Sequence, residues 1–167
     1  MNLELPIVIQ METMSKLFVD KTIEIDALPF KVWDVLTKPE YNNQWASESD
    51  DGAPFRIESD WHIAAPVRWH GVDSQVVVEG NVTRFEPEKL LRFTVFDVRS
   101  AERPPVTEED GITLELNRHD ARTFLRVRQG DFSVMSDGEK YRQLSANVWD
   151  GVLPKIKQLA AKPADKS

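Results

Sequence analysis

The sequence contains no cysteine, few glycines and no long apolar run, and each absence excludes a class of protein. Without cysteine the chain can form no disulfide, no zinc site built on thiolates and no thiol nucleophile. Its seven glycines are dispersed, so no glycine-rich loop of the kind that holds phosphates is present. No apolar run approaches the ~20 residues that a membrane-spanning helix needs. We therefore expect no phosphate loop and no membrane association.

Basic residues are outnumbered by acidic ones, with 21 Lys and Arg against 28 Asp and Glu, which gives a net charge of −7. An acidic chain without a basic stripe repels the phosphate backbone, so no nucleic acid is expected as a partner. The acidic runs at residues 47–52 and 107–110 lack the spaced oxygen ligands of a calcium loop, and we interpret them as solvated loops. We predict neither a metal ion nor a cofactor.

The length of 167 residues suits one domain with one core. In the N-terminal stretch, acidic Glu4 precedes the apolar patch and no small-residue cleavage site follows it. This is not the pattern of a secretion signal, so we expect a cytoplasmic protein. We predict an N-terminal arm over residues 1–15, one domain over residues 16–162 and a polar tail over residues 163–167. The sequence does not decide between a monomer and a homodimer.

Hydrophobic periodicity predicts one strand, two short helices, six strands and one long helix. Residues 16–27 alternate as a strand does, Pro29 can open a helix, and Pro39 should separate it from a second one. Strand patterns return at Phe55 and continue, with turns at residues 86–89 and 118–121, to residue 130. The resulting sheet has one apolar face, which another element must cover.

The long helix is predicted over residues 139–162, and it is the element available to cover the sheet. Pro154 lies inside it and removes a backbone donor, so we expect a kink or a local rearrangement there, with the helix continuing beyond. The stripe expected to be buried recurs at three- and four-residue spacing: Leu144, Val148, Val152, Ile156 and Leu159.

Gly80 interrupts the strand pattern of residues 76–98. A glycine inside a strand marks a bulge, a sharp bend or a close approach of another group. We expect the sheet to bend at Gly80 and the missing side chain to leave space on the concave face, beside Val78 and Val82. On this interpretation alanine is tolerated at the position. A bulge with no link to any pocket is the alternative.

The order of elements resembles the helix-grip fold of the START, Bet v 1 and polyketide-cyclase-like proteins. Five segments across residues 21–159 resemble, more closely, the branch related to the Hsp90 ATPase activator domain: KVWDVLTKPEYNNQW, WHIAAPVRWHG, EGNVTRFEPEKLLRFT, RTFLRVRQGDF and NVWDGVLPKIKQL. The resemblance implies an α+β fold in which a curved seven-stranded antiparallel sheet surrounds a long C-terminal helix, with two short helices after the first strand. It also implies an apolar cavity between sheet and helix.

Five tryptophans, a large number for this length, fit the wall of such a cavity, although core filling alone would also account for each ring. The residues predicted to line it are Trp33, Trp45, Trp61, Trp69, Val78, Gly80, Phe93, Trp149 and Val152.

Catalytic patterns are scarce, because the three histidines, His62, His70 and His119, are not at metal-ligand spacing and no GxSxG elbow is present. We predict no catalytic residue. A strand arginine that faces inward could anchor a ligand carboxylate, and most strand arginines should face water. The four candidates are Arg84, Arg92, Arg126 and Arg128.

The expected function is therefore binding of a hydrophobic small molecule in the cavity. One alternative, which the resemblance implies, is a module that interacts with an Hsp90-type chaperone. Another is a small cyclase or hydrolase that uses the same cavity.

Overall fold

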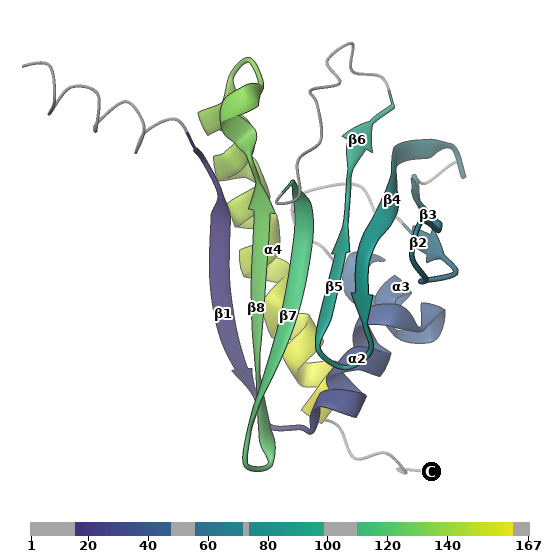
Figure 1. Cartoon of the computed structure of the whole chain (residues 1–167), viewed down its shortest axis with the longest axis vertical. Helices are drawn as coiled ribbons and strands as arrows, with labels where there is room; N and C mark the ends of the chain where they lie inside the picture. Colours follow the sequence, from purple (N-terminus) through teal and green to yellow (C-terminus); the bar gives the residue numbers. More distant parts are fainter. Residues whose placement is uncertain (1–15, 48–55, 72–73, 99–109, 162–167) are drawn as a thin grey trace, which may run out of the picture.

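A computed structural model describes residues 16–47, 56–71, 74–98 and 110–161, and in this part of the chain eight antiparallel strands form one sheet (Figure 1). Three α-helices pack against one of its faces. The order along the sheet is β1-β8-β7-β5-β4-β3-β2, and the short β6 pairs with β4. The strands are β1 (Val19–Ile25), β2 (Arg56–Ser59), β3 (Pro66–His70), β4 (Val76–Glu86), β5 (Leu90–Phe93), β6 (Phe96–Asp97), β7 (Gly111–His119) and β8 (Arg122–Gly130). The helices are α2 (Pro29–Thr37), α3 (Pro39–Ser47) and α4 (Gly138–Ala161), with a 3-10 turn η1 (Phe132–Val134) before α4.

Strand β1 confirms the predicted alternation, because Val19 and Ile25 are buried whereas Asp20, Thr22 and Glu24 are exposed. Its backbone lies against α4, which also contacts α2 and α3. Helix α2 contacts β7 and β8, and α3 contacts β2. We call β1, β7 and β8 the near half of the sheet, and β2, β3, β4 and β6 the far half.

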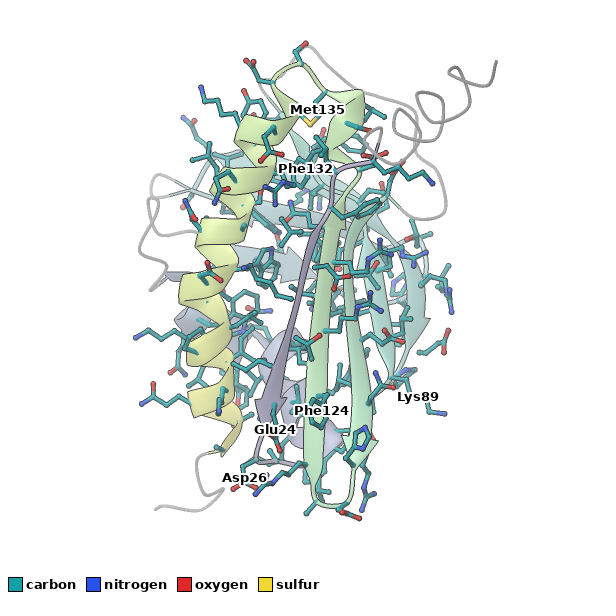
Figure 2. The ribbon with its side chains drawn as sticks, turned by 90° about the vertical axis from the view of Figure 1, so that its left-hand side faces the viewer. Glu24, Asp26, Lys89, Phe124, Phe132 and Met135 are labelled. Atoms are coloured by element: carbon teal, nitrogen blue, oxygen red, sulfur yellow. The ribbon has the colours of Figure 1, made fainter. Side chains whose placement is uncertain are left out.

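Figure 2 shows α4 running along one face of the near half, with Phe132 and Met135 near its first turn and Glu24 and Asp26 near its last. The 3-10 turn η1, which precedes α4, is fixed by Asp131, whose Oδ1 accepts hydrogen bonds from the backbone N–H groups of Leu17 and Ser133, both at 2.9 Å. Burial alone would raise the pKa of this carboxyl, but these hydrogen bonds outweigh it and the pKa is lowered. Asp131 thus joins the start of the domain to the turn before α4.

The two prolines that predict the short helices act as expected. Pro29 occupies the first turn of α2, where its missing N–H costs nothing. Lys38, which precedes Pro39, is extended and ends α2, because a residue before proline disfavours helical dihedrals. Pro39 then begins α3. The two helices are therefore separate and short, as the sequence predicts.

Helix α4 continues through Pro154 to Ala161, as predicted. Of the expected stripe, Val152 and Ile156 are buried, and Val148 and Leu159 are half-buried. Leu144 is 51% exposed, so its predicted burial is wrong. The buried face of the helix also includes a second set of residues: Ala146, Trp149, Leu153 and Ala160.

The stretch after the turn at residues 86–89 is divided into β5 and β6, instead of one continuous strand. At the break, the backbone N–H of Thr94 donates to the Asn81 carbonyl at 2.9 Å, and Thr94 Oγ1 accepts from the Asn81 N–H at 2.9 Å. The register also shifts between Val82 and Arg84. Strand β4 therefore passes from one set of partners to another at this point.

The predicted helix-grip architecture is confirmed, with a curved antiparallel sheet, two short helices after the first strand and a long C-terminal helix. The predicted arm at residues 1–15, the predicted tail at residues 163–167 and Phe55 lie outside the described residues.

Candidate ligand-binding site

The structure brings most of the predicted lining residues into one hydrophobic cluster on the helix-covered side of the sheet. Five of them are buried, and Trp61 and Trp69 pack against the cluster half-buried. Val78 and Gly80 are half-buried on β4, opposite Trp69 and Val67 of β3. The five buried residues are Trp33 on α2, Trp45 on α3, Phe93 on β5, and Trp149 and Val152 on α4.

Two of the buried tryptophan rings have their polar edge satisfied inside the fold. Trp45 Nε1 donates to the Val35 carbonyl at 2.9 Å, and Trp149 Nε1 donates to Gln129 Oε1 at 2.9 Å. A buried indole normally finds such a partner, since an unpaired N–H in an apolar interior is costly. These bonds fix the orientation of both rings and leave their faces for apolar contacts.

Aromatic contacts extend the cluster toward the far half of the sheet. The Trp61 and Phe93 rings meet edge to face, with centroids 5.6 Å apart. Trp61 has a positive φ of 50° and lies in the connection after β2, which ends at Ser59. The Trp33 ring is 5.6 Å from Phe85, which the sequence analysis did not select. Strict alternation from Val82 would place Phe85 outward, and the register shift between Val82 and Arg84 brings it onto the same face as buried Leu91. Half-buried Trp61 and Trp69 lie where the cluster meets the surface.

Gly80 makes room for the neighbouring backbone. A Cβ at this position would lie 1.8 Å from the Thr94 carbonyl oxygen and 2.9 Å from Thr94 Oγ1. The expectation that alanine is tolerated here is therefore wrong. The close approach is the one at the break between β5 and β6, so the glycine is required by the backbone of Thr94, fourteen residues later, and a Cβ here would meet that backbone instead of open space.

Two grooves lie on other parts of the surface. One, of about 360 Å³, lies on β3, β4 and β6, where cross-strand pairing places Arg68, Glu79 and Phe96 side by side on the outer face; its other lining residues are Pro66, Val67, Gly80 and Asn81. The other, of about 530 Å³, lies at the end of the sheet near the turn at residues 86–89 and the start of α2. Neither groove is on the helix-covered face.

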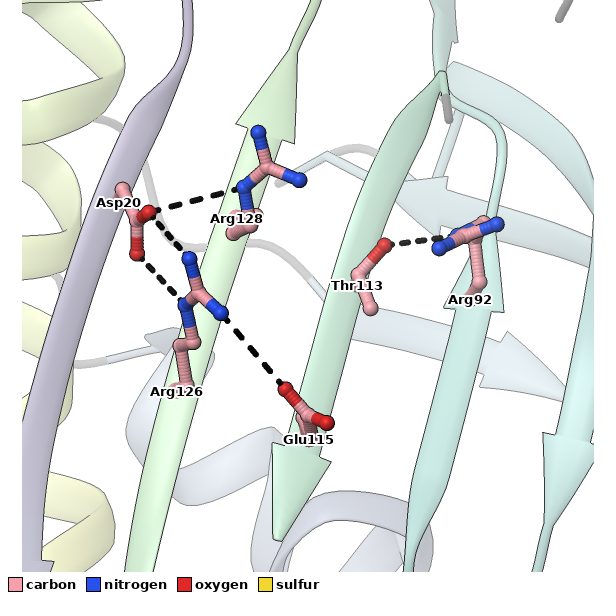
Figure 3. Close-up of polar contacts among 6 residues, drawn as sticks. All are labelled: Asp20, Arg92, Thr113, Glu115, Arg126 and Arg128. Atoms are coloured by element: carbon pink, nitrogen blue, oxygen red, sulfur yellow. Dashed lines mark hydrogen bonds and ion pairs between the residues drawn. The ribbon is translucent and has the colours of Figure 1, made fainter. Parts of the chain in front are cut away.

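The four strand arginines lie on the outer face of the sheet, so none of them anchors a ligand from inside. Figure 3 shows three of them, Arg92, Arg126 and Arg128. Arg126 binds Asp20 through two hydrogen bonds of 2.9 and 2.7 Å, and its hydrogen bond is the main cause that lowers the pKa of Asp20. Arg128 lies 3.6 Å from the same carboxylate, and Arg92 donates to Thr113 Oγ1 at 2.8 Å. Arg84 pairs with Glu86.

His70 and His119 each contact a neighbouring side chain. His70 Nε2 is 2.8 Å from Glu58 Oε1 at the β2–β3 edge of the sheet, where Glu58 is exposed, and the hydrogen bond from His70 lowers the pKa of Glu58. His119 stacks edge to face on Phe124. Within residues 16–47, 56–71, 74–98 and 110–161, no three His, Asp or Glu side chains gather as a metal site.

Sequence reasoning missed one polar residue on the inner side. Asn42 of α3 is only 1% exposed, and no hydrogen bond reaches its Oδ1 from the described part of the chain. Its position three residues before Trp45, on the same helix, is the signal that could have placed it inward.

None of the described helices is long and apolar enough to cross a membrane.

A family model described as "Activator of Hsp90 ATPase homolog 1-like protein" matches residues 26–161. A search of the curated proteins gave no match. Among solved structures, protein MLL2253 of Mesorhizobium loti is 21% identical, with a TM-score of 0.64 over 84% of this chain and 95% of its own. The Aha1 dimer of Colwellia psychrerythraea is 16% identical, with a TM-score of 0.64 over 89% and 98% of the two chains.

A third solved structure is DynU16, a protein of the dynemicin biosynthetic locus. It is 16% identical, with a TM-score of 0.63, and the match covers 84% of this chain and 46% of DynU16. At these identities the three structures show a shared fold.

Proposed function

Because the chain belongs to the family of activator of Hsp90 ATPase homolog 1-like proteins, we propose that it binds a hydrophobic small molecule between the sheet and the C-terminal helix. The site is the inner side of the far half and of the adjoining β5, beside α3, which contacts β2. The observation that carries the proposal is the aromatic cluster that reaches the surface through Trp61 and Trp69. Sites for small apolar molecules are lined mostly by aromatic and apolar side chains, with few polar groups.

The site can take a ligand without catalysing a reaction. Its buried rings present apolar faces, and the polar edges of Trp45 and Trp149 are already bonded within the fold. The buried polar residues of the described part of the chain are Asn42 and three threonines, so no acid–base pair lies in the core and the cyclase or hydrolase alternative gains no support. Binding is therefore the function that this arrangement supports best.

The proposal is tested with N-phenyl-1-naphthylamine, an uncharged probe whose fluorescence rises in apolar surroundings. We expect saturable binding of one probe per chain, and weaker binding by Trp69→Ala. Phe124→Ala is the matched control, because Phe124 is a half-buried aromatic residue that faces outward between Glu24 and Asn117. Unsaturable fluorescence in the wild type would overturn the proposal. Equal loss of affinity in the two variants would overturn the location.

The family name favours a second candidate, interaction with an Hsp90-type chaperone. On that hypothesis, adding the protein should raise the steady-state ATPase rate of a purified Hsp90-type chaperone. An unchanged rate, with no complex in size-exclusion chromatography, would contradict it. The probe experiment and the ATPase experiment are independent, so either function can fail without the other.

A further inference from the structure

Asn42 places an unpaired hydrogen-bond acceptor inside the apolar core. The residue is 1% exposed. Its side-chain Nδ2 donates a long hydrogen bond of 3.5 Å to the Thr37 carbonyl, and its Oδ1 is buried with no hydrogen-bond partner in the described part of the chain. Buried polar groups in native proteins almost always have a partner, so such an oxygen requires an explanation.

The orientation of the amide follows from its neighbour. If the side chain were flipped, Oδ1 would face the Thr37 carbonyl, and two acceptors would then oppose each other. The donor therefore faces Thr37, and the acceptor faces away from α2's last turn. The unpaired atom is the oxygen, so its missing partner must be a donor.

The oxygen lies on the inward face of α3. Asn42, Trp45 and Ala46 are the buried residues of this helix, at the three- and four-residue spacing that gathers side chains on one face. Trp45 and Ala46 belong to the hydrophobic cluster, and α3 contacts β2, α2 and α4. Asn42 thus lies on the same buried face of α3 as Trp45, one of the residues proposed to line the ligand site.

We propose that Asn42 Oδ1 accepts a hydrogen bond from the ligand, which makes the ligand an apolar ring compound carrying a hydroxyl or N–H donor. The inference rests on the proposed function, since it names a contact within that site. A pocket that is otherwise apolar uses a few polar groups to orient its ligand, and a donor on the ligand would satisfy the buried oxygen. A ring compound with only acceptors would leave Asn42 unpaired.

The test compares 2-naphthol with 2-methoxynaphthalene, which share the same rings but differ in that only naphthol has a donor. Dissociation constants are measured by equilibrium dialysis for the wild type, Asn42→Leu and Asn43→Leu. Asn43 is the matched control, because its Oδ1 is also buried without a partner but it is absent from the buried face of α3. We expect the preference for naphthol to fall roughly 3- to 10-fold in Asn42→Leu, the worth of one hydrogen bond, and to stay unchanged in Asn43→Leu.

The outcomes separate the two proposals. If both probes bind the wild type but Asn42→Leu keeps its preference, or Asn43→Leu loses it instead, the assignment to Asn42 is overturned and the proposed function stands. If neither probe binds the wild type, both fail. Binding of 2-methoxynaphthalene by Asn42→Leu shows that the variant is folded. Should it not fold, Asn42→Ala removes the same oxygen without added volume and takes its place in the comparison.

Discussion

The near and far halves of the sheet are built differently, although they belong to one fold. In the near half, β1, β7 and β8 pair in unbroken register, and aliphatic residues such as Ile25, Leu125 and Val127 are completely buried. In the far half, the strands are shorter or irregular, with register shifts at Trp69/His70 and Val82/Arg84. Its inner side carries tryptophans that are only half-buried.

We interpret the near half as the part that stabilises the fold and the far half as the part that binds the ligand. Aliphatic side chains in regular strands pack densely against α2 and α4, and the buried hydroxyl of Thr123 beside them donates to the Ala27 carbonyl at 2.7 Å. The irregular half has the aromatic rings, the close approach at Gly80 and, on the helix beside it, the unpaired oxygen of Asn42. Regions that admit ligands are usually drawn from the less stable parts of a structure. We therefore expect slower amide exchange in β7 and β8 than in β2 and β3.

The largest effect is expected on the helix that supports the near half. Val152 is 2% exposed, and Val152→Asp would bury an unpaired carboxylate. The cost is comparable with the whole stability of a domain, about 5 to 15 kcal/mol, so we expect loss of the cooperative melting transition in circular dichroism. Leu144→Asp is the control on the same helix, because Leu144 is 51% exposed and should change stability by about 0.5 kcal/mol or less. A folded Val152→Asp variant would show that α4 does not close the core.

A smaller effect is expected in the far half. Gly80→Ala would bring a Cβ within 1.8 Å of the Thr94 carbonyl oxygen, so the strands must separate. We expect a loss of about 1 to 3 kcal/mol in urea denaturation, with faster amide exchange in β3 and β4 and little change in β7 and β8.

Gly71→Ala is the matched control, since a Cβ there meets Val77 Cγ1 at 3.4 Å, an ordinary contact. Equal exchange in both halves after Gly80→Ala would show that they unfold as one unit and would break the comparison.

The sequence was sufficient to predict the near half and the order of elements. Alternation in residues 16–27, the prolines at 29 and 39 and the turn at residues 118–121 are local signals, and the structure places a strand, two helices and a hairpin there. The break at Thr94 could not be predicted, because it depends on Gly80 of the adjacent strand. Gly80 was recognised as unusual, but which group approaches it is a property of the sheet.

The inward face of α4 shows a second limit of sequence reasoning. Spacing alone selected the stripe from Leu144 to Leu159, whereas the structure buries Trp149, Leu153 and Ala160 as well and leaves Leu144 exposed. Several stripes on an amphipathic helix have similar spacing, and contacts with β1, α2 and α3 decide which one turns inward. For the same reason the arginines of the outer face and Asn42 of the inner face could be assigned only once the elements were in place.

Asp131 allows a moderate test of how the near half is fixed to α4. Its Oδ1 accepts from Leu17 and Ser133, so Asp131→Ala leaves two backbone N–H groups without that acceptor. We expect a loss of about 1 kcal/mol, typical of a lost cap, measured by urea denaturation. Asp131→Asn keeps an acceptor oxygen and should lose less. If Ala and Asn are equally harmful, charge is what matters at this position.

The smallest effect is expected on the outer face of the near half, where Asp20 pairs with Arg126 and Arg128. About two-fifths of the Asp20 and Arg126 side chains is exposed, at 42% and 43%, so solvent screens the pair and Asp20→Asn should cost less than about 1 kcal/mol. The hydrogen bond from Arg126 lowers the pKa of Asp20 in the folded state. The ion pair therefore contributes stability above the unfolded pKa of about 3.9, and this contribution disappears as pH falls through the folded value.

The test is the difference in unfolding free energy between wild type and Asp20→Asn, measured by urea denaturation from pH 7 down to pH 3. This difference should shrink toward the acid end. It should also shrink in 0.5 M NaCl, where the Debye length is roughly 4 Å. A gap that persists in acid and in salt would mean that the outer face contributes to the near half through packing instead of charge, and the contrast between a stabilising inner side and a solvated outer side would not hold.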